Sequence, residues 1–158
     1  MNSLSKLFIL GCFCLLLPTS VFAESCEVGV KVIKGSKQKS KATNFGSLGK
    51  SLVSMKGQLE NLPYKEYGVM TTRSQSVKFG AEGNFSVRDA MDKPHVVKIK
   101  PLTVKDKRVE VLVDWHGSDS SKLLSTKLKV LNGESVMLGT DSSGEHSTIL
   151  SIQVSCPS

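Results

Sequence analysis

The side chains in this sequence that could carry acid–base or metal chemistry are its three histidines and their acidic neighbours. Asp114 and His116 are two residues apart, which would place them on the same face of a strand. A carboxylate beside an imidazole can bind a metal ion or transfer a proton. The same face would also carry Arg108 and Glu110, a composition that is typical of a solvated surface. We therefore keep a small periplasmic enzyme that uses the Asp114/His116 face as an alternative.

No other residues form a recognisable catalytic group. His95 is isolated in the sequence, and His146 lies in a polar stretch that is ordinary for a surface loop. There is no glycine-rich phosphate loop, no His-Glu-x-x-His helix and no nucleophile elbow, the patterns that indicate nucleotide binding, zinc proteolysis or serine hydrolysis. The sequence therefore predicts no catalytic residue, no metal ligand and no cofactor.

Lysine side chains are more informative than the histidines. The stretch from residue 34 to residue 44 contains no acidic residue and no apolar period, which predicts an exposed loop. Like charges that lie close together repel one another and favour a partner of opposite charge. We expect an anionic-surface contact formed by the four lysines of this loop, namely Lys34, Lys37, Lys39 and Lys41.

The charge balance along the chain points to the same segment. Residues 24 to 65 contain eight lysines and three acidic residues, whereas the residues after 65 contain 12 basic and 11 acidic ones. Cell-wall glycans, lipopolysaccharide and anionic lipid headgroups are the partners that such a loop would meet outside the cell. Nucleic acid is not favoured, because the run has no interleaved aromatic residues for base stacking. The alternative is a solvated loop that binds nothing.

Residues 1–23 have the layout of a secretory signal peptide. Lys6 precedes an apolar run from residue 7 to residue 17, and Val21-Phe22-Ala23 has small residues at its first and third positions. A lipoprotein signal that leaves a lipidated Cys12 is the alternative, because Ile9-Leu10-Gly11-Cys12 resembles a lipoprotein cleavage box. No later stretch reaches the roughly 20 apolar residues of a transmembrane helix. We expect a periplasmic or secreted protein whose single domain is residues 24–158.

Removal of such a signal would leave two cysteines, Cys26 and Cys156, near opposite ends of the chain. Both are in phase with the apolar residues of their segments, so both thiols would point to the buried face. An oxidising compartment allows them to form a disulfide, and we predict one. The other interpretations are a metal site, which two cysteines cannot complete, and a catalytic thiol, which needs an exposed electropositive setting.

Hydrophobic periodicity predicts an opening strand, one helix and then a series of strands. Apolar residues at steps of four and three indicate a helix from 46 to 62, which ends before Pro63. After Pro63 the period returns to two, most clearly in the pair of strands at residues 95–104 and 107–115. The fold class is α+β: one amphipathic helix packed on a mainly antiparallel sheet or small β-sandwich of about seven strands. The helical stripe consists of Leu48, Leu52, Met55, Leu59 and Leu62.

This order of elements, with Pro63-Tyr64-Lys65-Glu66-Tyr67 after the helix and a closing run from Leu124 to Cys156, resembles a group of small exported bacterial proteins that are uncharacterised. The resemblance implies export and a β-rich fold, and it brings no catalytic motif. We expect a non-enzymatic binding or structural module of the bacterial envelope, with an envelope protein or an anionic envelope polymer as its partner. The alternative is an accessory subunit of an envelope pilus or secretion assembly, in which a sheet edge adds a strand to a partner.

Overall fold

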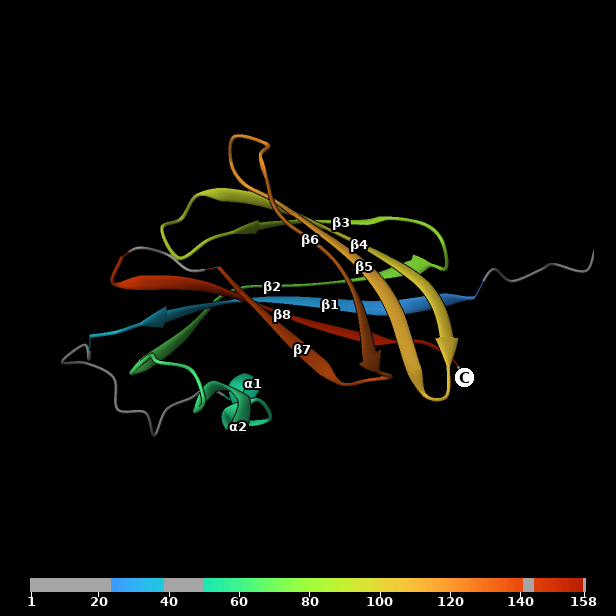
Figure 1. The fold of residues 1–158 in the computed structure, drawn as a ribbon, viewed down its shortest axis with the longest axis horizontal. Helices are drawn as coiled ribbons and strands as arrows, with labels where there is room; N and C mark the ends of the chain where they lie inside the picture. The colour runs from blue at the N-terminus through green and yellow to red at the C-terminus, as the bar shows by residue number, and fades with distance from the viewer. Residues whose placement is uncertain (1–23, 39–49, 141–143, 158) are drawn as a thin grey trace, which may run out of the picture.

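The computed structural model describes residues 24–38, 50–140 and 144–157. Within these ranges the chain forms two antiparallel sheets of four strands each (Figure 1). The first sheet has the order β2-β1-β8-β7, with β2 at Glu66–Lys78, β1 at Ser25–Ser36, β8 at His146–Ser155 and β7 at Ser135–Thr140. The second sheet has the order β3-β4-β5-β6, with β3 at Gly83–Arg88, β4 at Pro94–Lys105, β5 at Arg108–His116 and β6 at Lys122–Leu131.

The two sheets pack against each other and enclose the main hydrophobic core. Alternate residues of the central strands are fully buried, for example Val30 on β1 and Val111 on β5, while Trp115 is 1% exposed. This is the alternation that a sheet with one buried face requires. The prediction of a mainly β, antiparallel fold is therefore confirmed, and the arrangement is a sandwich of eight described strands.

The predicted helix from 46 to 62 is wrong as a continuous element. The chain instead forms two helices of one turn each, α1 at Lys50–Val53 and α2 at Lys56–Leu59. Met55 lies between them with φ −105° and ψ 3°, outside the helical region, and Gly57 follows two residues later within α2. Glycine costs about 1 kcal/mol relative to alanine inside a helix, so Gly57 disfavours one continuous helix through this segment.

Three residues of the apolar stripe are nevertheless buried, whereas Leu62 is half-buried and Leu48 lies outside the described residues. Leu52, Met55 and Leu59 are at most 3% exposed and pack with Ile33 and Ile149 on the outer side of the first sheet. Packing rather than helix propensity holds these turns, because isolated helices this short are not stable in water. Figure 1 shows both helices on one side of the sheet formed by β1, β8 and β7. No helix of the described residues is long and apolar enough to cross a membrane.

The predicted disulfide between Cys26 and Cys156 is confirmed, with sulfurs 2.07 Å apart and Cα atoms 4.1 Å apart. It joins the start of β1 to the end of β8, two strands that pair antiparallel next to the bridge. The loop after β6 closes over the same end, because Asn132 exchanges two hydrogen bonds with the backbone of Cys156. The first and last strands are therefore fixed together both by the sheet and by the bridge.

Candidate functional site

Basic side chains gather on the outer face of the second sheet. The inward positions of β4, β5 and β6 carry core residues such as Val97 and Val113, so the alternate positions point to solvent. We call this surface the basic face and define it by its cations, Lys98, Lys100, Lys105, Arg108, Lys122, Lys127 and Lys129. Sequence reasoning missed it because acidic residues elsewhere in the chain cancel these charges in a linear count. The sequence feature that could have revealed this face is lysine at every second position, as at Lys98 and Lys100 and at Lys127 and Lys129.

Three ion pairs neutralise part of the basic face. Lys122 Nζ lies 3.2 Å from Asp114 Oδ1, Lys127 Nζ lies 2.9 Å from Glu110 Oε1, and Lys98 Nζ lies 3.1 Å from Glu82 Oε1. The other four cations form no ion pair with a carboxylate of the described ranges. These four are Lys100, Lys105, Arg108 and Lys129, and the last three lie close to the β4–β5 hairpin.

A hollow of about 450 Å³ lies among these unpaired cations and is the candidate site on this face. Its lining includes Lys105, Arg108 and Lys129, together with the carboxylates of Asp106 and Glu110. The hairpin positions them, because Asp106 and Lys107 both have positive φ, as a tight turn between β4 and β5 requires. Three cations around one hollow could bind a carboxylate, phosphate or sulfate group, while the two acids would repel a second anion placed close to them.

Asp114 and His116, the predicted acid–base pair, both lie on the basic face. The Ser125 hydroxyl, followed by the Lys122 ammonium, holds the pKa of Asp114 below its usual range despite partial burial. A carboxylate with a lowered pKa is a weak general base near neutral pH. His116 Nδ1 lies 3.5 Å from the Ser120 carbonyl oxygen and so is turned toward its own loop. Asp114 thus interacts with Lys122 and Ser125, which favours a role for Asp114 and His116 as ordinary surface residues.

The predicted lysine loop begins later than expected, because its first residue, Lys34, belongs to a strand. Strand β1 continues to Ser36, so Lys34 is a half-buried strand residue paired with Gly68 and Thr148 and is not part of an exposed loop. The strand is longer than predicted because its backbone finds partners on both sides. Lys37 is exposed, and its amide donates to the Glu145 carbonyl oxygen. Lys39 and Lys41 lie outside the described residues.

His95 belongs to a buried hydrogen-bond network that sequence reasoning missed. Its Nδ1 lies 3.1 Å from Trp115 Nε1, and its Nε2 lies 3.1 Å from Asp89 Oδ2. An indole N–H can only donate, so Nδ1 accepts, and the ring proton is therefore on Nε2 and is donated to Asp89. Both ring nitrogens are used inside the protein, which leaves none for substrate. The sequence feature that could have revealed this role is the position of His95 on β4, which alternates with the core residues Val97 and Ile99 and so lies on the same face.

The Asp89 carboxylate completes the network from the turn between β3 and β4. Burial alone would raise its pKa, but the amides of Lys93 and Met91, together with His95, lower the pKa below its usual value. Both amides donate to Oδ1 at 2.8 Å. The network therefore fixes a turn. Within the described ranges no group of three or more His, Cys, Asp or Glu side chains is arranged to hold a metal ion.

Comparison with known proteins gives no further guide to this site. No protein-family model matches the chain, and no curated protein matches it.

Proposed function

We propose that this protein is a non-enzymatic binding or structural module of the bacterial envelope, periplasmic or secreted, which contacts an anionic envelope polymer through its basic face. The observation that carries the proposal is the hollow on the basic face that is lined by three cations without ion pairs, Lys105, Arg108 and Lys129. The predicted signal peptide supports export, and the Cys26–Cys156 bridge is compatible with an oxidising compartment.

The geometry of a sheet face suits a polymer with repeated charges. Neighbouring strands are about 4.8 Å apart, and residues on one face of a strand repeat at about 6.8 Å. Cations of the basic face are therefore spaced at regular intervals, and an extended polyanion can contact several of them at once. Each exposed contact is weak and screened by salt, so affinity would come from several contacts at once. The Lys34, Lys37, Lys39 and Lys41 segment is a second proposed contact for the same kind of partner.

The test compares two variants with the same loss of charge. In the first, Lys100, Lys105, Arg108 and Lys129 are changed to Gln. In the control, the exposed residues Lys56, Lys65, Lys78 and Lys93, which lie off the basic face, are changed to Gln. Retention of each variant on isolated envelope is measured over a series of salt concentrations.

We expect the first variant to lose most of its retention at low salt and to show a smaller salt dependence, while the control stays close to the parent. Equal losses in both variants would show that net charge alone is responsible and would contradict the assignment to the basic face. The melting temperature should not change in either variant, because the substituted side chains lie outside the core.

A further inference from the structure

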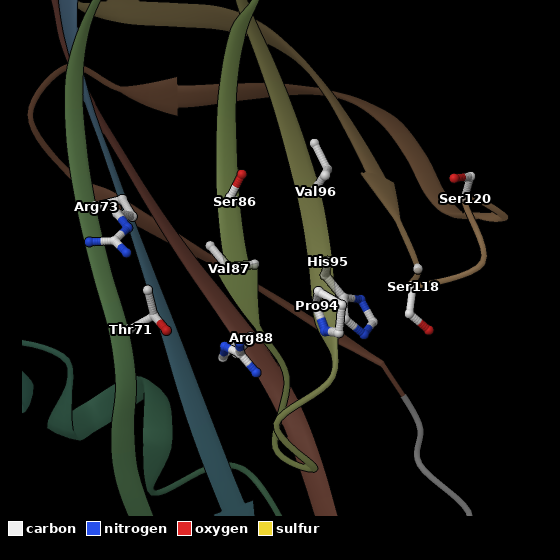
Figure 2. A pocket seen from close by; sticks show the side chains of 11 residues that line it. Thr71, Arg73, Ser86, Val87, Arg88, Pro94, His95, Val96, Ser118 and Ser120 are labelled. Atoms are coloured by element: carbon white, nitrogen blue, oxygen red, sulfur yellow. The ribbon is translucent and has the colours of Figure 1, made fainter.

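A second hollow lies at the opposite end of strand β4 from the basic-face site, where the two sheets part. Strands β2 and β3 follow one another in sequence but are edge strands of different sheets. At one end they touch, because a Cβ on Gly83 would lie 2.5 Å from Gln75 Nε2 and 2.6 Å from Val77 Cγ2. Toward the other end a hollow of about 370 Å³ is lined by residues of both strands, of the start of β4 and of the loop between β5 and β6 (Figure 2).

Arginine side chains line this opening, which we call the arginine groove and define by Thr71 and Arg73 on β2 and Ser86, Val87 and Arg88 on β3. The sequence contains three arginines, and two of them line this hollow. Arg88 Nη1 is held by Asp92, with its carbonyl oxygen at 2.9 Å and its carboxylate at 3.2 Å. Arg73 forms no ion pair with any carboxylate of the described ranges. Figure 2 shows Arg73 on β2, with Ser86, Val87 and Arg88 on the neighbouring strand β3.

The position of Arg73 on its strand is unusual. It pairs with Val30 in the register of β1 and β2, so it shares the inward face with core residues, although its side chain is exposed at the sheet edge. An inward-pointing charge on an edge strand blocks pairing with an apolar strand, because that strand would bury the charge without a partner. A strand that brings a carboxylate to the same place removes this penalty. Arg73 would then select its partner by charge.

Strand β2 has the features of an acceptor edge. It has 13 residues and, among the strands of the described ranges, pairs with β1 alone, so within those ranges the backbone groups on its other side have no strand partner. The stretch from Gly68 to Arg73 lies beyond the point where Gly83 approaches, and within it Val69 and Met70 are 38% and 43% exposed. Six residues of free edge span about 20 Å, the length of an ordinary strand.

We propose that an extended segment of another protein adds to residues 68–73 of β2 as a further strand, with a glutamate or aspartate side chain placed in the arginine groove against Arg73. Backbone hydrogen bonds to the edge would supply affinity, and the carboxylate would supply specificity. The site shares no residue with the basic face, so the inference does not depend on the function proposed above. Its partner is a polypeptide, whereas the basic face would take a polymer of repeated charge.

The test uses a synthetic peptide of alternating threonine and valine with one central glutamate, and a matched peptide with glutamine in that place. We expect the glutamate peptide to bind, and to bind about tenfold or more tightly than the glutamine peptide, because a charge-assisted hydrogen bond is lost in the latter. Arg73→Gln should remove the difference. Arg108→Gln, which removes the same charge from the basic face, should leave it unchanged.

Two further measurements separate strand addition from simple anion binding. A glutamate peptide with alternate backbone nitrogens methylated on the pairing edge keeps its charge and should lose binding. Bound peptide should also protect amides within residues 68–73 from hydrogen exchange. Arg73→Glu should bind a peptide with a central lysine and reject the glutamate peptide.

The proposal is overturned if the glutamate peptide does not bind, if the methylated peptide binds equally well, or if glutamate and glutamine peptides bind alike. Because Arg73 is exposed, its substitution should not change the melting temperature, so loss of binding in Arg73→Gln cannot be attributed to unfolding.

Discussion

Asp89, His95 and Trp115 connect a surface turn to the core. Asp89 accepts from the amides of Met91 and Lys93 and from His95, and the amide of Ala90 donates to the Thr148 hydroxyl at 3.0 Å. Thr148 belongs to β8 in the first sheet, whereas the turn joins β3 and β4 of the second. The network therefore holds the two sheets together at the end away from the disulfide.

Replacing Asp89 with Asn should destabilise the protein by about 2 kcal/mol at pH 7, because a buried carboxylate with several donors would be lost. Trp115 is the only tryptophan in the sequence, so its fluorescence reports both the network and global unfolding. Denaturant titration followed by this fluorescence measures the change. Asp92→Asn, in the same turn but exposed, is the matched control and should change stability little.

The pH dependence of Asp89 has a defined sign. Because its folded-state pKa is lowered, ionised Asp89 stabilises the fold fully above the unfolded value of about 3.9, and this stabilisation is lost as pH falls through the lower folded-state pKa. Between pH 5 and about pH 3 the parent should therefore lose more stability than Asp89→Asn does. Parallel losses in the two proteins would show that other carboxylates control acid unfolding.

Gly83 permits the close approach of β3 to β2. A Cβ at this position would lie within 2.7 Å of atoms of both Gln75 and Val77, and Gly83 is buried. Gly83→Ala should destabilise the fold by about 1 to 3 kcal/mol, as overpacking does in other cores. Gly68→Ala on β2 is the control, because no atom lies within 4 Å of its added Cβ, and it should cause no loss. Thermal unfolding of both variants distinguishes packing from a general effect of removing glycine.

Strands such as β3 and β5 could be predicted from sequence because each has one buried face, which leaves an alternating pattern of apolar and polar residues. The helix could not be predicted in full, because the stripe that includes Leu52, Met55 and Leu59 is satisfied equally by one continuous helix or by two separate turns. The break after Val53 depends on how well these residues fit against Ile33, which is a contact made across the fold.

The candidate sites were harder to predict than the strands. To predict the basic face one must know which strands are neighbours. Lys100 and Lys127, for example, lie in one row across the sheet because both pair with Leu112 of the strand between them. The arginine groove requires the packing of two sheets, because Arg73 and Arg88 come from edges of different sheets. The alternation of residues along β2 could have shown that Arg73 lies on the same face of the strand as the core residue Val77.

The whole sandwich is closed by its first and last strands. β1 lies in the middle of the first sheet between β2 and β8, so separation of β1 from β8 would divide this sheet into two pairs of strands. Its inward residues Val28, Val30 and Val32 are fully buried against the second sheet. The disulfide prevents these ends from separating widely even in the unfolded chain, where no sheet exists.

The Cys26–Cys156 bridge spans a sequence separation of 130 residues. In the chain-entropy model a loop of that length stabilises the fold by about 5 kcal/mol. Reduction of the parent protein should therefore lower its denaturant midpoint, and Cys26→Ala with Cys156→Ala should have the same midpoint with or without reductant. Alanine is preferred to serine here because a buried hydroxyl would add a cost of its own. If reduction leaves the parent's midpoint unchanged, the paired strands alone hold the ends together and the bridge contributes little.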